Sequence, residues 1–172
     1  MRVRPLHIAL SLSALIVGTL TSAGPAQAAP GADPDVLWTS LQNSATLKCL
    51  DVRARSTADG AVIQQFDCNG NSNQKFGYGQ TNMGGWALFT RHAWKCVDTR
   101  GGADEGSGVV QWTCNGSGGQ QWRLELVAPR LVLVRNLSSG KCLQDMGQPS
   151  GSRREVGQAT CTGASHQLWN RG

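Results

Sequence analysis

The chain has 172 residues with a formal net charge of +5; 16% of the residues are charged and 40% are hydrophobic. This length excludes a large multidomain enzyme, and the composition excludes a disordered chain. The basic residues are dispersed, with Arg153-Arg154 as their tightest cluster, so we expect no nucleic-acid partner.

The N-terminus has the pattern of a signal peptide. Two arginines precede an apolar stretch, Ile8–Leu20, and small residues follow as far as Ala26-Gln27-Ala28. This order predicts cleavage after Ala28. A membrane anchor is the alternative, but the apolar stretch is shorter than the ~20 residues of a span. We therefore expect residues 1–28 to be a signal peptide, residues 29–37 to be a linker, and the mature protein to be secreted, extracellular and without a membrane segment.

Six cysteines divide the remaining chain into similar units. They are Cys49, Cys68, Cys96, Cys114, Cys142 and Cys161. The first, third and fifth cysteines follow one another at intervals of 47 and 46 residues. The second, fourth and sixth follow at intervals of 46 and 47 residues. The neighbouring residues keep the same period, since Lys48–Asp51 recurs as Lys95–Asp98 and Lys141–Gln144. The chain therefore contains three copies of one unit of about 46 residues, near residues 38–84, 85–130 and 131–172.

The cysteines are expected to form disulfides. An even number in an exported chain favours bridges, and the lack of a C-x-x-C pair argues against a zinc site. We expect neither a metal nor a cofactor. Six cysteines allow fifteen pairings, of which three respect a threefold repeat. We predict the most local of these three, which joins Cys49–Cys68, Cys96–Cys114 and Cys142–Cys161.

Each unit predicts four short strands separated by turn residues. In the first unit these are Trp38–Gln42, Lys48–Val52, Ala61–Phe66 and Lys75–Tyr78. About twelve strands in three units indicate an all-β, pseudo-threefold β-trefoil, because three blades would be too few for a propeller.

A closing Q-x-(W/F) motif ends each unit. Its aromatic residues are expected to meet near the pseudo-threefold axis and fill the core; they are Phe76, Trp122 and Trp169. Its glutamines are expected to tie strands together through hydrogen bonds to the backbone; they are Gln74, Gln120 and Gln167.

The three units resemble those of the ricin-type (R-type) lectins, which are also the family 13 carbohydrate-binding modules of secreted glycoside hydrolases. The resemblance rests on the C-(L/V)-D openings, the three Q-x-(W/F) closings and the matching cysteine pairs, and it extends from about Trp38 to Asn170. It implies one shallow site per unit for galactose- or xylan-type sugars. Such a site holds a carboxylate that accepts sugar hydroxyls, an amide that donates and accepts, and an aromatic ring that packs on the sugar.

Carried over unit by unit, the resemblance predicts sites of unequal quality. The first unit has the complete set, which is Asp51, Gln64, Phe66, Asn73 and Gln74. The second unit has Asp98, Trp112 and Gln120. It carries Val110 and Gly119 where the first unit has Gln64 and Asn73, so its activity is an open question.

The third unit departs furthest from the set. It keeps His166 before its Q-x-W motif but has Gln144, Gly157 and Ala159 at the other positions. We expect this site to be vestigial. Its Asp145 lies one position late, which in a strand points to the opposite face.

Two other classes of function stay open. A β-trefoil protease inhibitor would act through an exposed loop and would not require the sugar-binding set. A glycoside hydrolase would need two carboxylates, but Asp59 and Asp67, the acids nearest Asp51 in the sequence, lie in or beside turns.

We expect a monomeric binding protein with a carbohydrate partner and no enzymatic activity. Asp51 is expected to be exposed before sugar binds. Trp86 and Trp94 are expected in the core, and the alternative is that either one widens a sugar-binding surface.

Overall fold

The computed structural model describes residues 36–100, 102–147 and 154–172, so the expected signal peptide lies outside the described residues. Each unit contributes four strands, as predicted. The first unit forms β1 (Leu41–Asn43), β2 (Cys49–Val52), β3 (Ala61–Phe66) and β4 (Phe76–Gln80). The second forms β5 (Trp86–Thr90), β6 (Cys96–Asp98), β7 (Val110–Trp112) and β8 (Trp122–Ala128). The third forms β9 (Leu131–Asn136), β10 (Cys142–Asp145), β11 (Arg154–Ala159) and β12 (Leu168–Arg171).

Short 3-10 helices accompany these strands. They are η1 (Arg53–Arg55), η2 (Ser72–Gln74), η3 (Gly118–Gln120) and η4 (Ser165–Gln167). Three of them, η2, η3 and η4, stand at the same place in each unit, directly before its last strand. In the part of the chain that the structure describes, no helix has the length and apolarity that crossing a membrane requires.

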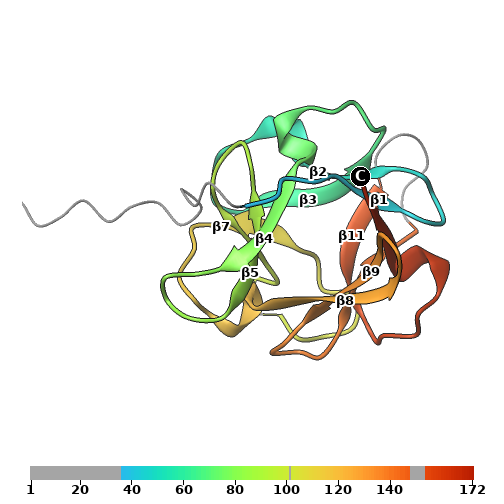
Figure 1. Ribbon diagram of the computed structural model, residues 1–172. Coiled ribbons are helices and arrows are strands. Elements are labelled where there is room, and N and C mark those ends of the chain that lie inside the picture. Colours follow the sequence, from blue (N-terminus) through green and yellow to red (C-terminus); the bar gives the residue numbers. More distant parts are fainter. Residues whose placement is uncertain (1–35, 101, 148–153) are drawn as a thin grey trace, which may run out of the picture.

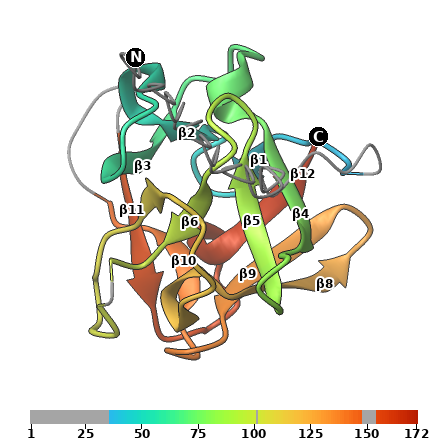
Figure 2. The ribbon, with the colours of Figure 1, turned by 90° about the vertical axis from the view of Figure 1, so that its left-hand side faces the viewer.

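The first and last strands of the units form a barrel. Antiparallel pairs join β1 to β12, β4 to β5, β8 to β9, and β9 to β12. A single bridge between Thr39 and Phe76 connects the chain before β1 to β4, and β5 packs against β8. Figures 1 and 2 both show β4 beside β5 and β8 beside β9.

The middle strands of each unit form hairpins that cap one end of this barrel. The hairpins are β2–β3, β6–β7 and β10–β11. They join one another through β3–β7, β3–β11 and a bridge between Gly108 and Gly157. A barrel with three capping hairpins is a β-trefoil, so the predicted fold class is confirmed.

Strand boundaries differ from the prediction mainly in β1. This strand begins at Leu41 rather than Trp38, because Trp38–Ser40 pair only through the bridge at Thr39. The bounds of β3 are those predicted. The three predicted disulfides are confirmed, with Cα atoms 5.0 to 5.1 Å apart.

The core lies where the three units meet. Phe76, Trp122 and Trp169 are all fully buried, which confirms their predicted structural role. The two indole N–H groups donate to the carbonyls of Val97 (2.8 Å) and Leu143 (3.1 Å), so neither tryptophan leaves its polar atom unpaired.

The expectation that Trp86 and Trp94 are core residues is wrong. Trp86 is 43% exposed at the start of β5 and stacks on Tyr78, with ring centroids 4.9 Å apart. Trp94 is 38% exposed in a turn and meets Trp38 edge to face. Leu88, two residues beyond Trp86 on β5, fills the core instead.

Candidate functional site

A pocket of about 200 Å³ lies over the β2–β3 hairpin of the first unit. Its lining residues are Asp51, Ala54, Arg55, Gln64, Phe66, Asn69, Asn71 and Asn73. Four of the five residues predicted for this unit therefore come together. Asp51 and Gln64 are opposite one another in the hairpin, and Phe66 lies two positions along β3, on the same face as Gln64.

Asp51 is at the centre of a buried hydrogen-bond network. Its Oδ1 accepts from Gln64 Nε2 at 2.9 Å, and its Oδ2 accepts from Asn73 Nδ2 at 2.8 Å and from Gln74 Nε2 at 3.0 Å. Only 3% of the residue is exposed, so the expectation that Asp51 is exposed is wrong. The reason is that the segment carrying Asn73 and Gln74 folds against β2.

Burial also sets the electrostatics of this carboxyl group. Loss of solvent raises the pKa of Asp51, and this effect exceeds the opposing hydrogen bonds from Gln64, Gln74 and Asn73 and the nearby charge of His92. The amide donors therefore stabilise the charged form of the carboxyl group, while the loss of hydration destabilises it.

One buried acceptor in this pocket has no partner. Asn73 donates from Nδ2 to Asp51 and to the carbonyl of Val52, while its Oδ1 is buried without a hydrogen bond among the described residues. A buried acceptor left in this state costs free energy unless a donor arrives. A ligand hydroxyl would supply that donor.

Two arginines near the pocket were missed by the sequence reasoning. Arg53 Nε donates to Gln64 Oε1 at 3.0 Å, which turns the Gln64 amide nitrogen toward Asp51. Arg55 lines the pocket and is exposed. Ala54 and Arg55 both have positive φ, near 56° and 55°. The available signal in the sequence was the pair of arginines, Arg53 and Arg55, that begins two positions after Asp51.

The glutamines of the Q-x-(W/F) motifs lie behind the pockets rather than in their linings. Each Nε2 donates to the backbone carbonyl before the second cysteine of its unit, at 3.0, 3.0 and 2.8 Å for Gln74, Gln120 and Gln167. Each Oε1 accepts from a backbone N–H just after that cysteine. The predicted ties to backbone are thus present in all three units.

A second pocket, of about 390 Å³, lies at the corresponding place in the second unit. Its lining residues are Asp98, Arg100, Trp112, Asn115 and Ser117, which include two of the three predicted residues. Asp98 accepts from the Arg100 N–H at 2.7 Å and from Gln120 Nε2 at 2.9 Å. Trp112 is 43% exposed, so its ring is accessible.

Gly119 is the residue of the second unit that corresponds to Asn73 of the first, and the space around it explains why it is a glycine. A Cβ at this position would lie 2.7 Å from Thr99 Oγ1 and 3.0 Å from Asp98 Oδ1. The segment therefore approaches Asp98 too closely to admit an asparagine. The second pocket keeps the carboxylate and the ring but lacks the amide that covers Asp51 in the first.

The third unit has different side chains at these positions. Gln144 Oε1 accepts from Gln167 Nε2 at 2.7 Å, in the place of the carboxylate. A Cβ on Gly157, opposite Gln144, would lie 2.9 Å from the backbone carbonyl oxygen of Ser107 and 3.1 Å from the Met146 side chain, so a side chain there would collide with the backbone. Asp145 pairs in register with Val156, as Val52 pairs with Ile63, and so takes the alternate position on the strand.

Comparison with known proteins gives one family and a group of similar folds. A family model described as "Ricin-type beta-trefoil lectin domain-like" matches residues 32–112 and 118–171. The designed 3-fold symmetric protein ThreeFoil is 28% identical, with a TM-score of 0.72 over 78% of this chain and 96% of its own. The search of curated proteins gives no match.

Two natural proteins with the same fold have lower identity. The exo-beta-1,3-galactanase 1,3Gal43A from Clostridium thermocellum is 22% identical, with a TM-score of 0.74 over 80% of this chain and 30% of its own. The Rhizoctonia solani agglutinin is 19% identical, with a TM-score of 0.67 over 79% of this chain and 94% of its own. At these identities the likeness establishes the fold alone.

Proposed function

Because the chain belongs to the ricin-type beta-trefoil lectin domain-like family, we propose that it is a secreted, monomeric carbohydrate-binding protein without enzymatic activity. The family match and the agglutinins among the similar structures support carbohydrate binding. Three disulfides favour an oxidising, extracellular location. We propose galactose- or xylan-type glycans as ligands; the galactanase among the similar structures supports the first of these.

The observation that carries this proposal is the first-unit pocket, where a carboxylate, two amides and an aromatic ring converge. Sugar hydroxyls would donate to Asp51, and one of them would also satisfy the unpaired Oδ1 of Asn73. The Phe66 ring offers a flat apolar surface for the C–H face of a pyranose. The amide hydrogen bonds hold the carboxylate in position before the ligand arrives, which lowers the ordering cost of binding.

The pocket favours binding over hydrolysis. A glycosidase needs two carboxyl groups on either side of the scissile bond. Asp51 is the only carboxylate among the described residues that line the first pocket, and Asp98 is the only one that lines the second. A protease inhibitor would have no use for this arrangement of acid, amide and ring.

A glycan array on the mature protein, followed by calorimetric titration with the best ligand, tests the proposal. Phe66→Ala should weaken binding roughly 10- to 100-fold, because it removes the apolar contact of a ring. Phe66→Trp, which keeps a ring, is the matched control and should bind. Normal binding by Phe66→Ala would place the site elsewhere, and release of sugar products from the ligand would overturn the non-enzymatic assignment.

A further inference from the structure

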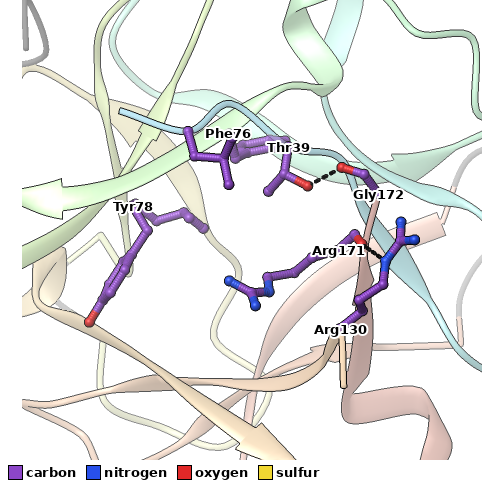
Figure 3. A pocket seen from close by; sticks show the side chains of 8 residues that line it. Thr39, Phe76, Tyr78, Arg130, Arg171 and Gly172 are labelled. Atoms are coloured by element: carbon purple, nitrogen blue, oxygen red, sulfur yellow. Dashed lines mark hydrogen bonds between the residues drawn. The ribbon is translucent and has the colours of Figure 1, made fainter. Parts of the chain in front are cut away.

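A third cavity, of about 360 Å³, lies at the open end of the barrel. Its lining residues are Leu37, Thr39, Phe76, Tyr78, Leu88, Arg130, Arg171 and Gly172, shown in Figure 3. They come from the chain before β1, from β4 and β5, from the β8–β9 turn and from the end of β12. The topology places these ends away from the capping hairpins, so the cavity shares no residue with either sugar pocket.

The walls of the cavity are mostly apolar. Phe76 and Leu88 are buried core residues, and the half-buried Tyr78 adds an aromatic ring. The Tyr78 hydroxyl is already used, since it donates to the Trp122 carbonyl at 3.2 Å. These side chains present carbon atoms and few groups that could hydrogen-bond the hydroxyls of a sugar.

One charged group enters this apolar space. In Figure 3 the Arg171 side chain extends into the cavity from the end of β12, toward the side where Tyr78 lies. Its Nε is buried and has no hydrogen-bond partner, and no ion pair joins Arg171 to another residue in the part of the chain that the structure describes. The residue as a whole is only half-buried, but a buried N–H donor without a partner is unfavourable.

The second arginine at the cavity is already partnered. Arg130 Nε donates to the backbone carbonyl of Arg171 at 2.9 Å, and Figure 3 shows this side chain rising along the opposite side of the strand. The Thr39 hydroxyl likewise donates to the carbonyl of Gly172 at the rim. Only the Nε of Arg130 is engaged in this way, but in Figure 3 it is the Arg171 side chain that extends into the cavity, so Arg171 is the group placed to meet a ligand there.

We propose that this cavity binds a small carboxylate with an apolar body. A planar guanidinium matches a carboxylate in a bidentate hydrogen-bonded pair, which would also satisfy the Arg171 Nε. The walls formed by Phe76, Tyr78 and Leu88 would cover the apolar body of the ligand. The volume lies in the range of small-molecule sites, and the mixture of apolar walls with one polar anchor is typical of them.

The test uses 3-phenylpropionate as the probe and 3-phenylpropanol as its neutral analogue. The wild-type protein should bind the acid at least about tenfold more tightly than the alcohol by calorimetric titration. Arg171→Met keeps the apolar stem but removes the guanidinium, and it should reduce affinity for the acid by about tenfold or more. Arg91→Met removes an exposed arginine from the turn after β5 and should bind the acid like the wild type.

Two further measurements keep the test independent of folding defects and of the sugar sites. In the wild-type protein, NMR shifts caused by 3-phenylpropionate should centre on Tyr78 and Leu88. Phe66→Ala should lose sugar binding but keep the acid site. Equal affinity for acid and alcohol, absence of binding to the wild type, shifts centred on Phe66 or Trp112, or unchanged binding by Arg171→Met would each overturn the proposal.

Discussion

At the scale of single residues, the acid position of each unit serves the fold, and in the proposed function it also serves the ligand. In all three units the residue two positions after the first cysteine accepts a hydrogen bond from the Q-x-(W/F) glutamine, and it does so as Asp51, Asp98 and Gln144. The fold therefore requires an acceptor there but not a charge. A charge at this position, present in two units, is what a sugar-binding site needs.

Asp51→Ala is expected to destabilise the protein. The substitution would leave Gln64, Asn73 and Gln74 without the buried acceptor that their side chains share. Unsatisfied buried donors cost about 1–3 kcal/mol, so urea unfolding should show a loss of that size. Asp67→Ala is the control, because Asp67 is 64% exposed and pairs only with Lys48, and it should change stability by less than about 0.5 kcal/mol. Equal effects of the two substitutions would contradict the network.

The raised pKa of Asp51 predicts that sugar affinity falls at mildly acidic pH. Burial raises this pKa, so the carboxyl takes up its proton at a higher pH than an exposed aspartate does. Once neutral, it loses the charge-assisted hydrogen bonds to sugar hydroxyls. Calorimetric titrations at decreasing pH should show affinity declining as the pH passes down through the raised pKa. Asp51→Asn should bind weakly at every pH, and His92→Gln should keep the decline; a wild-type affinity that stays constant over the whole acidic range in which the protein is folded would exclude this mechanism.

At the scale of elements, one acidic residue in each of the first two units accepts hydrogen bonds from the next unit. Asp59 accepts from the Thr113 N–H at 2.7 Å, and Glu105 accepts from the Thr160 N–H at 2.9 Å. Both also accept from the hydroxyl of the same threonine. These contacts connect the turn before β3 to the end of β7, and the turn before β7 to the end of β11, so they hold neighbouring hairpins together.

Acid should weaken these contacts. The hydrogen bond from Lys95 and those from Thr113 lower the pKa of Asp59, and those from Thr160 and Lys141 lower the pKa of Glu105. A depressed folded-state pKa gives stability that is present above the unfolded-state pKa and is lost as the pH falls through the folded-state pKa. The double variant Asp59→Asn, Glu105→Gln should unfold at lower urea than the wild type at pH 7. Its deficit should shrink at pH 3 and vanish at lower pH; a deficit that stays constant would show that the ionised contacts contribute nothing.

The elements that could be predicted from the sequence are those fixed by local pattern. The strands follow from short β-prone runs between turn residues. The period reduces the cysteine pairings to three, of which the most local is the one observed, so both predictions needed only one unit and its copies. The burial of Asp51 could not be predicted this way, because it depends on how the segment with Asn73 and Gln74 folds back over β2.

The exposed tryptophans were not predictable for a related reason. Trp86 and Leu88 are both apolar and lie on the same face of β5, and only the closed barrel determines how far along the strand the core extends. In the candidate site, the resemblance supplied the residues that line the pockets but not Arg53 or Arg55 beside them. Arg171 was also missed, since its surroundings come from strands at opposite ends of the sequence.

At the scale of the whole molecule, stability depends on three aromatic side chains packed around one axis. Trp122→Ala should cost about 3–5 kcal/mol, because it empties a large core volume and leaves the Val97 carbonyl without its indole donor. Trp86→Ala deletes the same side chain at a 43%-exposed position and should cost far less. Chemical denaturation of both variants measures the difference, and comparable losses would mean that the core does not centre on the axis.

The pseudo-threefold symmetry of the fold does not extend to the side chains of the candidate sites, so we expect the three units to differ in binding capacity. The first pocket combines carboxylate, amides and ring, the second lacks Asn73 and Gln64 equivalents, and the third has Gln144, Gly157 and Ala159 at these positions. Shallow recognition of sugar hydroxyls gives weak sites, with Kd on the order of millimolar to micromolar. A trefoil with three equal sites would gain avidity on a polymer by raising the effective concentration of each site, but this chain has few sites to link.

Calorimetric titration with the preferred sugar should therefore give one binding event per chain and at most a second, much weaker event. Phe66→Ala should remove the stronger event and Trp112→Ala only the weaker one, since each ring belongs to a different pocket. If the protein is the monomer with one effective site that we propose, it should cross-link cells poorly in an agglutination assay. Three equivalent events would show that the third unit binds sugar through residues other than the acid and ring it lacks, and the inequality of the units would then have no functional consequence.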